Sequence, residues 1–360
     1  MAARPILPIF DGHNDTLLAL RGFRPEQRSA RSFFERSDQG HVDLPRAREG
    51  GFGGGFFAVF IPSPPAAAGD EGSDLTITAT GYEVRMAPPV EQAYALRATL
   101  AVIADLFRME VESGGQLRVV RTAAELGTCL RDDVLAAVLH VEGAEAIDPE
   151  LDALEVFYRA GLRSVGIVWS RPNAFGYGVP FRYPSSPDTG PGLTAAGRDL
   201  VRACNRLGIM LDLSHLNERG FWDVAALSDA PLVASHSAAH AICPSTRNLT
   251  DKQLDAIRES RGIVGLNFEV SSIRADAWDE PNTPLSVLVD QIDYLVARLG
   301  IDHVGFGSDF DGATMPREIG DAAGLPNLIR ALRDRGYDEP ALRKLAHENW
   351  LRVLGTTWRG

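Results

Sequence analysis

Short apolar runs rich in β-branched residues alternate with longer helical patterns along most of this sequence. Eight runs have the length and composition of strands: residues 6–10, 55–61, 134–141, 164–169, 209–213, 231–234, 262–267 and 303–307. Such alternation predicts βα units around a parallel sheet, and eight units fit a (β/α)8 barrel of the TIM type. A doubly wound open sheet is the alternative, but no Gly-x-Gly-x-x-Gly turn follows the first strand.

The length of 360 residues suits one barrel, so we expect a single domain over residues 1–360. Helical periodicity predicts outer helices over residues 90–112 and 285–299, the second introduced by Thr283 as N-cap and Pro284 as first helical residue. Residues 62–89 and 171–192 are expected to be loop insertions, which often shape the substrate pocket of a barrel.

The charge balance excludes some classes of partner. The chain has 36 basic and 48 acidic residues, a net charge of -12, which disfavours nucleic acid and anionic membrane surfaces. The three cysteines are far apart and form no disulfide framework, which indicates reduced thiols. The amino terminus lacks a secretory signal pattern and no apolar run reaches the roughly 20 residues of a membrane helix. We therefore expect a cytoplasmic protein.

The first chemically distinctive segment is Asp-Gly-His-Asn-Asp at residues 11–15, which closes the first predicted strand. In an extended segment the two-residue step from His13 to Asp15 projects both side chains to the same side. One imidazole and one carboxylate are thereby offered to one metal ion.

Four further polar residues end other predicted strands: Glu142, His215, His236 and Asp309. Burial of a carboxylate at such a position is costly unless a cation or a donor satisfies it. Because active sites of these barrels are built at the carboxyl ends of the strands, the five strand ends predict one metal site. Imidazole and carboxylate ligands suit zinc, although manganese, cobalt and iron accept the same types of ligand.

With these residues the sequence resembles the membrane (renal) dipeptidase family of metallopeptidases, in its bacterial type. The resemblance extends from about Asp11 to Leu354. It is most specific in these motifs: Asp-Gly-His-Asn-Asp at 11–15, Val-Glu-Gly at 141–143, Asp-Leu-Ser-His at 212–215, Ser-His-Ser at 235–237, Arg-Asn at 247–248 and Gly-Ser-Asp-Phe-Asp-Gly at 307–312.

The resemblance implies a metal-dependent hydrolase barrel with two divalent ions, zinc in this family. It assigns His13 and Asp15 to one ion, His215 and His236 to the other, and Glu142 to a bridge that they share with a hydroxide. Many related barrels bridge with a carboxylated lysine instead, but both lysines of this chain, Lys252 and Lys344, lie in helical patterns.

The resemblance also implies catalytic and substrate-binding roles. Asp309, with the bridging Glu142, is the expected catalytic residue, because a carboxylate can take a proton from water and deliver it to the leaving amine. Arg247 matches the family residue that holds the terminal carboxylate of the substrate. Trp169 and Asn173 are expected to contact the substrate as well.

Two positions depart from the renal pattern. Trp169 stands where the eukaryotic enzymes have a histidine that is thought to stabilise the tetrahedral intermediate, and an indole offers one neutral donor. His140 replaces a glycine, and its period-two relation to Glu142 predicts a buried histidine one layer deeper in the barrel.

These expectations combine into a zinc dipeptidase for dipeptides with a free carboxylate, including those with a D-residue at the carboxyl terminus. The sequence does not determine the oligomeric state, although relatives in this family are often dimers, which makes a homodimer a candidate assembly. An amidase or lactonase acting on a small carboxylated molecule would use the same metals. A non-catalytic metal-binding or ligand-binding homologue is the alternative of another class.

Overall fold

Eight parallel strands close into a barrel in the computed structural model, which describes residues 7–22, 31–64 and 74–359. Each strand pairs with the next, β12 pairs with β1, and the pairing of β2 with β6 closes the ring. The strands are β1 (Ile9–Asn14), β2 (Phe52–Phe60), β6 (Leu135–Glu142), β7 (Ser164–Gly166), β9 (Met210–Asp212), β10 (Val233–Ser237), β11 (Ile263–Leu266) and β12 (Val304–Phe306). The predicted (β/α)8 barrel is thus confirmed, and a short strand β5 (Leu117–Val119) is added beside β6.

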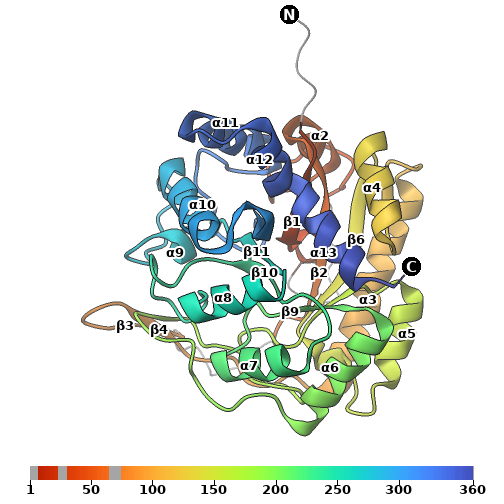
Figure 1. Cartoon of the computed structure of the whole chain (residues 1–360). Coiled ribbons are helices and arrows are strands. Elements are labelled where there is room, and N and C mark those ends of the chain that lie inside the picture. Colours follow the sequence, from red (N-terminus) through yellow and green to blue (C-terminus); the bar gives the residue numbers. More distant parts are fainter. Residues whose placement is uncertain (1–6, 23–30, 65–73, 360) are drawn as a thin grey trace, which may run out of the picture.

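Helices surround the strands on the outside (Figure 1). They are α1 (Thr16–Arg21), α2 (Leu44–Gly50), α3 (Gln92–Glu112), α4 (Ala123–Asp132), α5 (Asp152–Ala160), α6 (Ala195–Leu207), α7 (Glu218–Leu227), α8 (Asp251–Glu259), α9 (Val270–Ile273), α10 (Leu285–Leu299), α11 (Leu325–Arg335), α12 (Glu339–Arg343) and α13 (Asn349–Thr357). Among the described residues, no helix combines the length and the apolar character needed to cross a bilayer.

Both predicted outer helices are present. The pattern over residues 90–112 becomes α3, which begins two residues later, and α10 has the predicted bounds. The expected capping arrangement of α10 was wrong by one residue, because Pro284 itself is the N-cap, with an extended backbone. Proline has no N–H to contribute and so is tolerated at the start of a helix.

The strand ends differ from the sequence prediction at the residues that carry chemistry. His13, Glu142 and His236 lie inside β1, β6 and β10, whereas the predicted strands stopped before them. Backbone pairing continues past the apolar run because the ladder uses main-chain groups, whatever the side chain. Asp15 is not in an extended segment, since β1 ends at Asn14 and Asp15 is the N-cap of α1.

Alternation along the strands fills the inside of the barrel. In β6, Ala136 and Val138 belong to an inner cluster that also contains Phe10, Phe56 and Trp350. Trp350, on α13, donates its indole N–H to the backbone oxygen of Phe306 at 3.1 Å, and α13 crosses in front of the strands in Figure 1. The same period of two places His140 and Glu142 on the inner face, in successive layers above Val138.

Gly12, in β1, permits a close approach above this inner cluster. A Cβ at Gly12 would lie 2.6 Å from the Trp350 ring and 2.3 Å from the backbone oxygen of Ser235. Glycine is therefore required next to His13, and a larger side chain would displace the strand that carries this histidine.

The two predicted insertions pair with each other. Strands β3 (Leu75–Ile77) and β4 (Tyr82–Val84) come from the first insertion, and β8 (Arg182–Tyr183) comes from the second; together they form a three-stranded antiparallel sheet. Figure 1 shows β3 and β4 projecting from the side of the barrel. Residues 65–73 of the first insertion lie outside the described residues.

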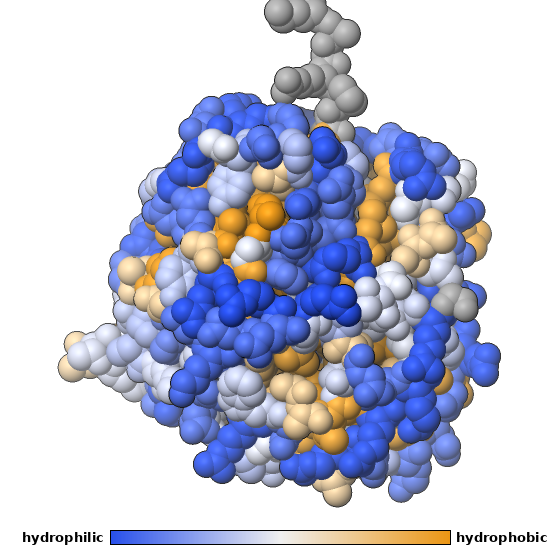
Figure 2. Space-filling model, viewed as in Figure 1, coloured by the Kyte–Doolittle hydropathy of each residue, from blue (hydrophilic) through white to orange (hydrophobic). Residues whose placement is uncertain are grey.

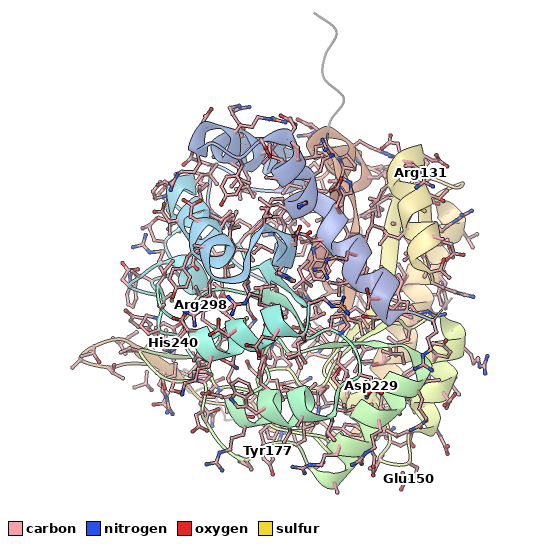
Figure 3. All side chains as sticks on the ribbon, in the orientation of Figure 1. Arg131, Glu150, Tyr177, Asp229, His240 and Arg298 are labelled. Carbon is pink, nitrogen blue, oxygen red and sulfur yellow. The ribbon has the colours of Figure 1, made fainter. Side chains whose placement is uncertain are left out.

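The face shown in Figure 2 is largely hydrophilic, with small apolar areas between the helices. Arg131, Glu150 and Asp229, labelled in Figure 3, are all exposed. These charged side chains therefore point to solvent, as expected for a barrel whose core lies inside and beneath the helices.

Candidate metal centre and active site

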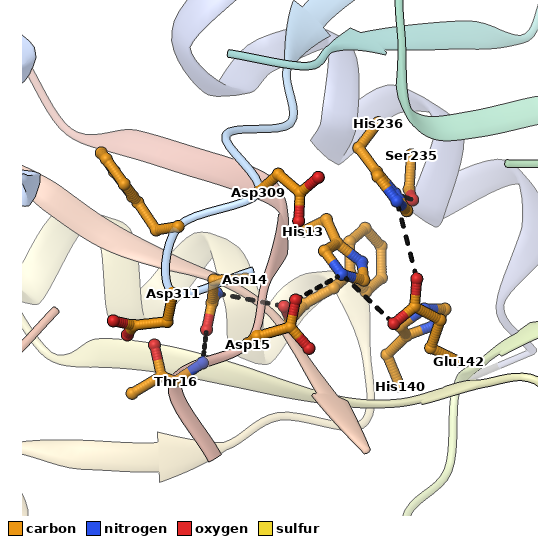
Figure 4. A network of polar contacts seen from close by, with 12 residues as sticks. His13, Asn14, Asp15, Thr16, His140, Glu142, Ser235, His236, Asp309 and Asp311 are labelled. Atoms are coloured by element: carbon orange, nitrogen blue, oxygen red, sulfur yellow. Dashed lines mark hydrogen bonds and ion pairs between the residues drawn. The ribbon is translucent and has the colours of Figure 1, made fainter. Parts of the chain in front are cut away.

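Five side chains from four segments of the barrel converge on one point at the carboxyl ends of the strands. They are His13, Asp15, Glu142, His215 and His236, and Figure 4 shows His13, Asp15, Glu142 and His236 facing one another. All five are buried, with exposures between 0% and 6%. The structure thus brings together the residues that the sequence predicted for the metal site.

Glu142 lies at the centre of this group. Its Oε2 is 3.7 Å from His13 Nε2, and its Oε1 is 3.2 Å from His215 Nε2 and 3.6 Å from His236 Nε2. The two carboxylate oxygens therefore face different partners. On the other side of His13, Asp15 Oδ2 is 3.4 Å from Nε2.

The ligand types and the bonding of these atoms fit divalent cations. Among the described residues, both ring nitrogens of His13 and Asp15 Oδ1 are buried without a hydrogen-bond partner, which is uncommon for polar atoms in a protein interior. Two sets of side chains place ligand atoms within 4.8 Å of one another, namely His13, Glu142 and His236, and His13, Asp15 and Asp309. Nitrogen and oxygen donors of this kind suit zinc.

His13 and the buried acidic residues around it shift one another's pKa. Burial lowers the pKa of His13, but the charges of Glu142 and Asp15 outweigh this effect and raise it to about 10. Burial raises the pKa of Glu142 to about 8, against the opposing charge of His13. Crowded buried carboxylates of this kind are stabilised by positive charge placed between them.

The other two histidines behave in the opposite way. Burial, with the positive charges of Arg247 and His13, lowers the pKa of His215 and of His236 well below the usual value. Both rings are therefore neutral at pH 7, which is the form that binds a metal ion. Each ring also has a serine partner, because Ser170 Oγ is 2.8 Å from His215 Nδ1 and Ser235 Oγ is 2.8 Å from His236 Nδ1.

Asp309 follows β12 and lies beside His13 in Figure 4. Its φ of +63° is unusual for a residue other than glycine and marks a conformation that its surroundings must impose. Its backbone N–H donates to His13 O at 3.0 Å, and Asn267 Nδ2 donates to its Oδ2 at 2.9 Å. Burial raises the pKa of Asp309 to about 6, assisted by the charge of Asp15 and opposed by that of His13.

The buried carboxylate of Asp11 holds the start of the loop that follows β12 and carries Asp309. Asp11 accepts hydrogen bonds from the Ser308 N–H at 2.6 Å and the Ser308 hydroxyl at 2.9 Å. Asp11 lies on β1 and Ser308 immediately precedes Asp309, so these bonds fix the distance between the first strand and the candidate proton acceptor.

A cavity of about 670 Å³ opens above the site, within the usual range for small-molecule pockets. It is lined by the following residues that the sequence had nominated: Asp15, Glu142, Trp169, His215, Arg247 and Asp309. Arg247 is 5% exposed, and its Nη2 donates to His236 O at 3.1 Å. Arg247 is therefore a buried guanidinium at the wall of the cavity, next to one of the histidines.

Trp169 forms an aromatic wall of the cavity with two neighbours. Its ring centroid is 5.1 Å from that of Phe60, 5.7 Å from that of Phe181 and 6.0 Å from that of His215. The side of the cavity next to His215 is therefore largely apolar.

Asn173 is not among the residues that line the cavity. Its Nδ2 donates to Ile167 O at 2.8 Å, and its Oδ1 accepts from the Phe175 N–H at 2.9 Å and the Gly176 N–H at 3.2 Å. The structure does not support the expected contact with substrate, because these bonds use the amide to shape the loop after β7.

His140 lies beneath the ligands, as its spacing from Glu142 predicted. It is 0% exposed, its ring centroid is 5.6 Å from that of His13, and its Nδ1 is 2.8 Å from Ser164 Oγ. Burial lowers the pKa of His140 to about 4, so the ring is neutral.

Six residues that hold the site were not predicted from the sequence: Asp11, Ser170, Asp212, Ser235, Asn267 and Ser308. A signal for some of them was present in the sequence, because a serine immediately precedes each of His215, His236 and Asp309. All three serines are buried within or just after a barrel strand, where a hydroxyl needs a polar partner.

Comparisons with known proteins identify the family of this chain. The sequence model of the membrane dipeptidase family, peptidase family M19, matches residues 4–358. The chain is 53% identical to a metallopeptidase from Rhodobacter sphaeroides, whose crystal structure holds a phosphinate mimic of the dipeptide L-Ala-D-Ala; the match covers 98% of this chain and 100% of that one, with a TM-score of 0.92.

Sequence relatives extend the comparison. An uncharacterized protein in the pqqA 5' region of Klebsiella pneumoniae is 52% identical over 257 residues, which are 71% of this chain and 95% of that protein. The dipeptidase tcpJ of Claviceps purpurea is 29% identical over 96% of this chain and 76% of its own length. Because the family model matches nearly the whole sequence, this chain belongs to the membrane dipeptidase family, peptidase family M19, and is an enzyme of that family.

Proposed function

We propose that this enzyme is a zinc dipeptidase with two metal ions per chain, and that its substrates are dipeptides with a free carboxylate, including those whose second residue has the D configuration. The observation that carries the proposal is the position of Glu142, whose two oxygens face His13 on one side and His215 and His236 on the other. A carboxylate in this position suits a bridge between two cations.

The proposed ligands fall into two groups. His13 and Asp15 would hold one ion, His215 and His236 would hold the other, and Glu142 would contribute to both. Two bound divalent ions would supply Lewis acidity, which lowers the pKa of water and stabilises the negative charge that develops on the substrate oxygen.

Asp309 is the proposed proton carrier. Asn267 occupies Oδ2 of Asp309, so Oδ1 is the oxygen left to accept a proton from the attacking water. The same oxygen then delivers the proton to the leaving amine nitrogen. A single carboxylate can do both because the nucleophile and the leaving group are bound to the same carbonyl carbon.

Arg247 is the proposed partner of the substrate carboxylate. A buried guanidinium pairs strongly with a carboxylate, because its parallel N–H groups match the two oxygens. Arg247 lies next to His236, so the carboxylate would be held at a fixed distance from the scissile bond. The wall formed by Trp169 and Phe181 would contact an apolar part of the substrate.

The proposal of a D-residue is supported by the Rhodobacter sphaeroides relative, whose ligand mimics L-Ala-D-Ala. The test is steady-state kinetics of the zinc-loaded enzyme on L-Ala-L-Ala, L-Ala-D-Ala and the amide of each. We expect hydrolysis of both dipeptides and much slower hydrolysis of the amides. Hydrolysis of L-Ala-L-Ala alone would refute the stereochemical part, and equal rates on the amides would refute recognition of the carboxylate.

A further inference from the structure

Asp212, at the end of β9, is buried beside the proposed metal centre and is not one of its ligands. It is 1% exposed. Its Oδ1 accepts the backbone N–H groups of Ser214 at 3.1 Å and Ser235 at 2.8 Å, and its Oδ2 accepts the Ser235 hydroxyl at 2.5 Å. Three donors around one buried carboxyl group match an ionised carboxylate, which accepts hydrogen bonds and donates none.

The Ser235 hydroxyl connects this carboxylate to His236. Ser235 Oγ is 2.8 Å from His236 Nδ1, and a hydroxyl has a single hydrogen to donate. Since Asp212 receives that hydrogen, Ser235 must accept a hydrogen from His236 Nδ1. The proton of this neutral imidazole is therefore on Nδ1, and Nε2 has a free lone pair.

The free nitrogen points into the proposed metal centre. His236 Nε2 is 3.6 Å from Glu142 Oε1 and 3.1 Å from His215 Nε2. We propose that Asp212 is a positioning residue that acts through Ser235 to fix His236 in the Nδ1–H tautomer, so that Nε2 is always available to a metal ion. This inference rests on the proposed metal-binding function.

Competing arrangements of the hydroxyl hydrogen are weaker. Two other possible acceptors lie farther from the Ser235 hydroxyl than the Asp212 oxygen at 2.5 Å: His236 Nδ1 at 2.8 Å and Ser214 Oγ at 3.4 Å. Ser214 Oγ also accepts the backbone N–H of His236 at 3.1 Å, which holds the main chain of the histidine. A charged acceptor at the shorter distance determines the direction of the hydroxyl.

The hydrogen bonds that run from Asp212 through Ser235 to His236 form a relay. Asparagine at position 212 would keep the shape of the side chain but reverse the direction of these hydrogen bonds. The amide oxygen would keep the two backbone N–H groups that Oδ1 accepts, so the NH₂ group would face Ser235 Oγ. Ser235 would then accept from the amide and donate its own hydrogen to His236 Nδ1. The imidazole proton would move to Nε2, where it blocks metal binding.

The test combines ¹⁵N NMR of the metal-free protein with zinc and cobalt affinities from chelator competition. For wild type we expect the proton of His236 on Nδ1, and for Asp212→Asn we expect it on Nε2. Zinc affinity of Asp212→Asn should fall by about 10- to 100-fold, as is usual when a partner of a metal-binding histidine is lost. In Asp212→Asn/Ser235→Ala the affinity should recover in part, because the serine no longer enforces the wrong tautomer.

The matched control is Ser164→Ala, which removes another buried serine hydroxyl bonded to a histidine, in this case His140. It should leave both the His236 tautomer and the zinc affinity near wild type. An unchanged tautomer in Asp212→Asn would overturn the proposal. So would an equal loss of affinity when Asp212→Asn is introduced into wild type and into the Ser235→Ala variant, because Asp212 would then not act through the serine.

If Asp212→Asn does not fold, Ser235→Thr and Ser235→Ala carry the test. Threonine keeps the hydroxyl and should keep the Nδ1–H tautomer, whereas alanine should allow both tautomers and weaken binding. Equal behaviour of the two variants would overturn the relay. If wild type has the expected tautomer but binds neither zinc nor cobalt, the proposed function fails and the relay stands.

Discussion

The substitution Arg247→Met tests whether the buried guanidinium recognises the carboxylate of the substrate. Methionine keeps the length and much of the volume of the arginine side chain but removes its charge and donors. Arg247 is 5% exposed and lines the cavity, so a pair with the substrate would be shielded from water. Loss of such a charge-assisted pair costs about 2–4 kcal/mol, or roughly 30- to 800-fold in kcat/KM at about 1.4 kcal/mol per decade.

The assay compares L-Ala-D-Ala with its amide. The variant should lose this factor on the dipeptide and little on the amide, because wild type gains nothing from the arginine when the carboxylate is absent. Arg85 provides a matched control: it lines the same cavity, but its side chain is 64% exposed, and Arg85→Met should cost only a few-fold. Metal content is measured for both variants, since Arg247 also bonds to His236 O. Equal losses on the dipeptide and the amide would show that Arg247 does not bind the substrate carboxylate.

Two further predictions concern Asp309. Asp309→Asn should lower kcat by about 10²- to 10⁴-fold while most of the metal is retained, because the proton acceptor is lost and the shape of the side chain is kept. Measurement of kcat and metal content together tests this. A near wild-type rate would show that Asp309 is not the proton carrier. Asn267→Ala should shift the acid limb of the pH–kcat/KM profile to higher pH. The bond from Asn267 favours the ionised carboxylate, so its loss raises the pKa of Asp309 further above the usual value. When the pH is lowered, activity that needs the ionised form is therefore lost at a higher pH than in wild type. A bond of about 1.5 kcal/mol corresponds to about one pH unit; an unshifted limb would show that Asp309 is not the titrating group.

Much of the fold followed from periodicity. The alternation of apolar runs predicted the barrel, because buried parallel strands and amphipathic helices have distinct patterns. The ends of the strands were less predictable: β1 and β10 continue through His13 and His236, where polar side chains interrupt the apolar pattern but the backbone ladder does not stop. The pairing of β4 with β8 joins insertions about 100 residues apart in the chain, and local sequence carries little information on such contacts.

Some residues of the site could likewise be predicted from the sequence and others could not. Residues of unusual type at strand ends, such as Glu142, could be found in the sequence because charge at the end of an apolar run needs an explanation. The residues that orient them could not, since Ser235 and Asp212 are of types common in turns and caps. Asn173 shows the reverse error, because its position in a loop near the cavity does not determine the direction of its amide, which bonds to the backbone.

Metal stoichiometry tests whether Glu142 is shared by two metal ions. Wild type, and Glu142→Gln, are loaded with zinc, freed of excess metal, and analysed by inductively coupled plasma mass spectrometry. Glu269→Gln is the control, because Glu269 lines the same cavity but is not a proposed ligand. We expect about two zinc ions per chain in wild type and in the control, and weakened binding of both ions in Glu142→Gln. One ion per chain in a fully active wild type, or loss of a single ion in Glu142→Gln, would show that Glu142 is not shared by two ions.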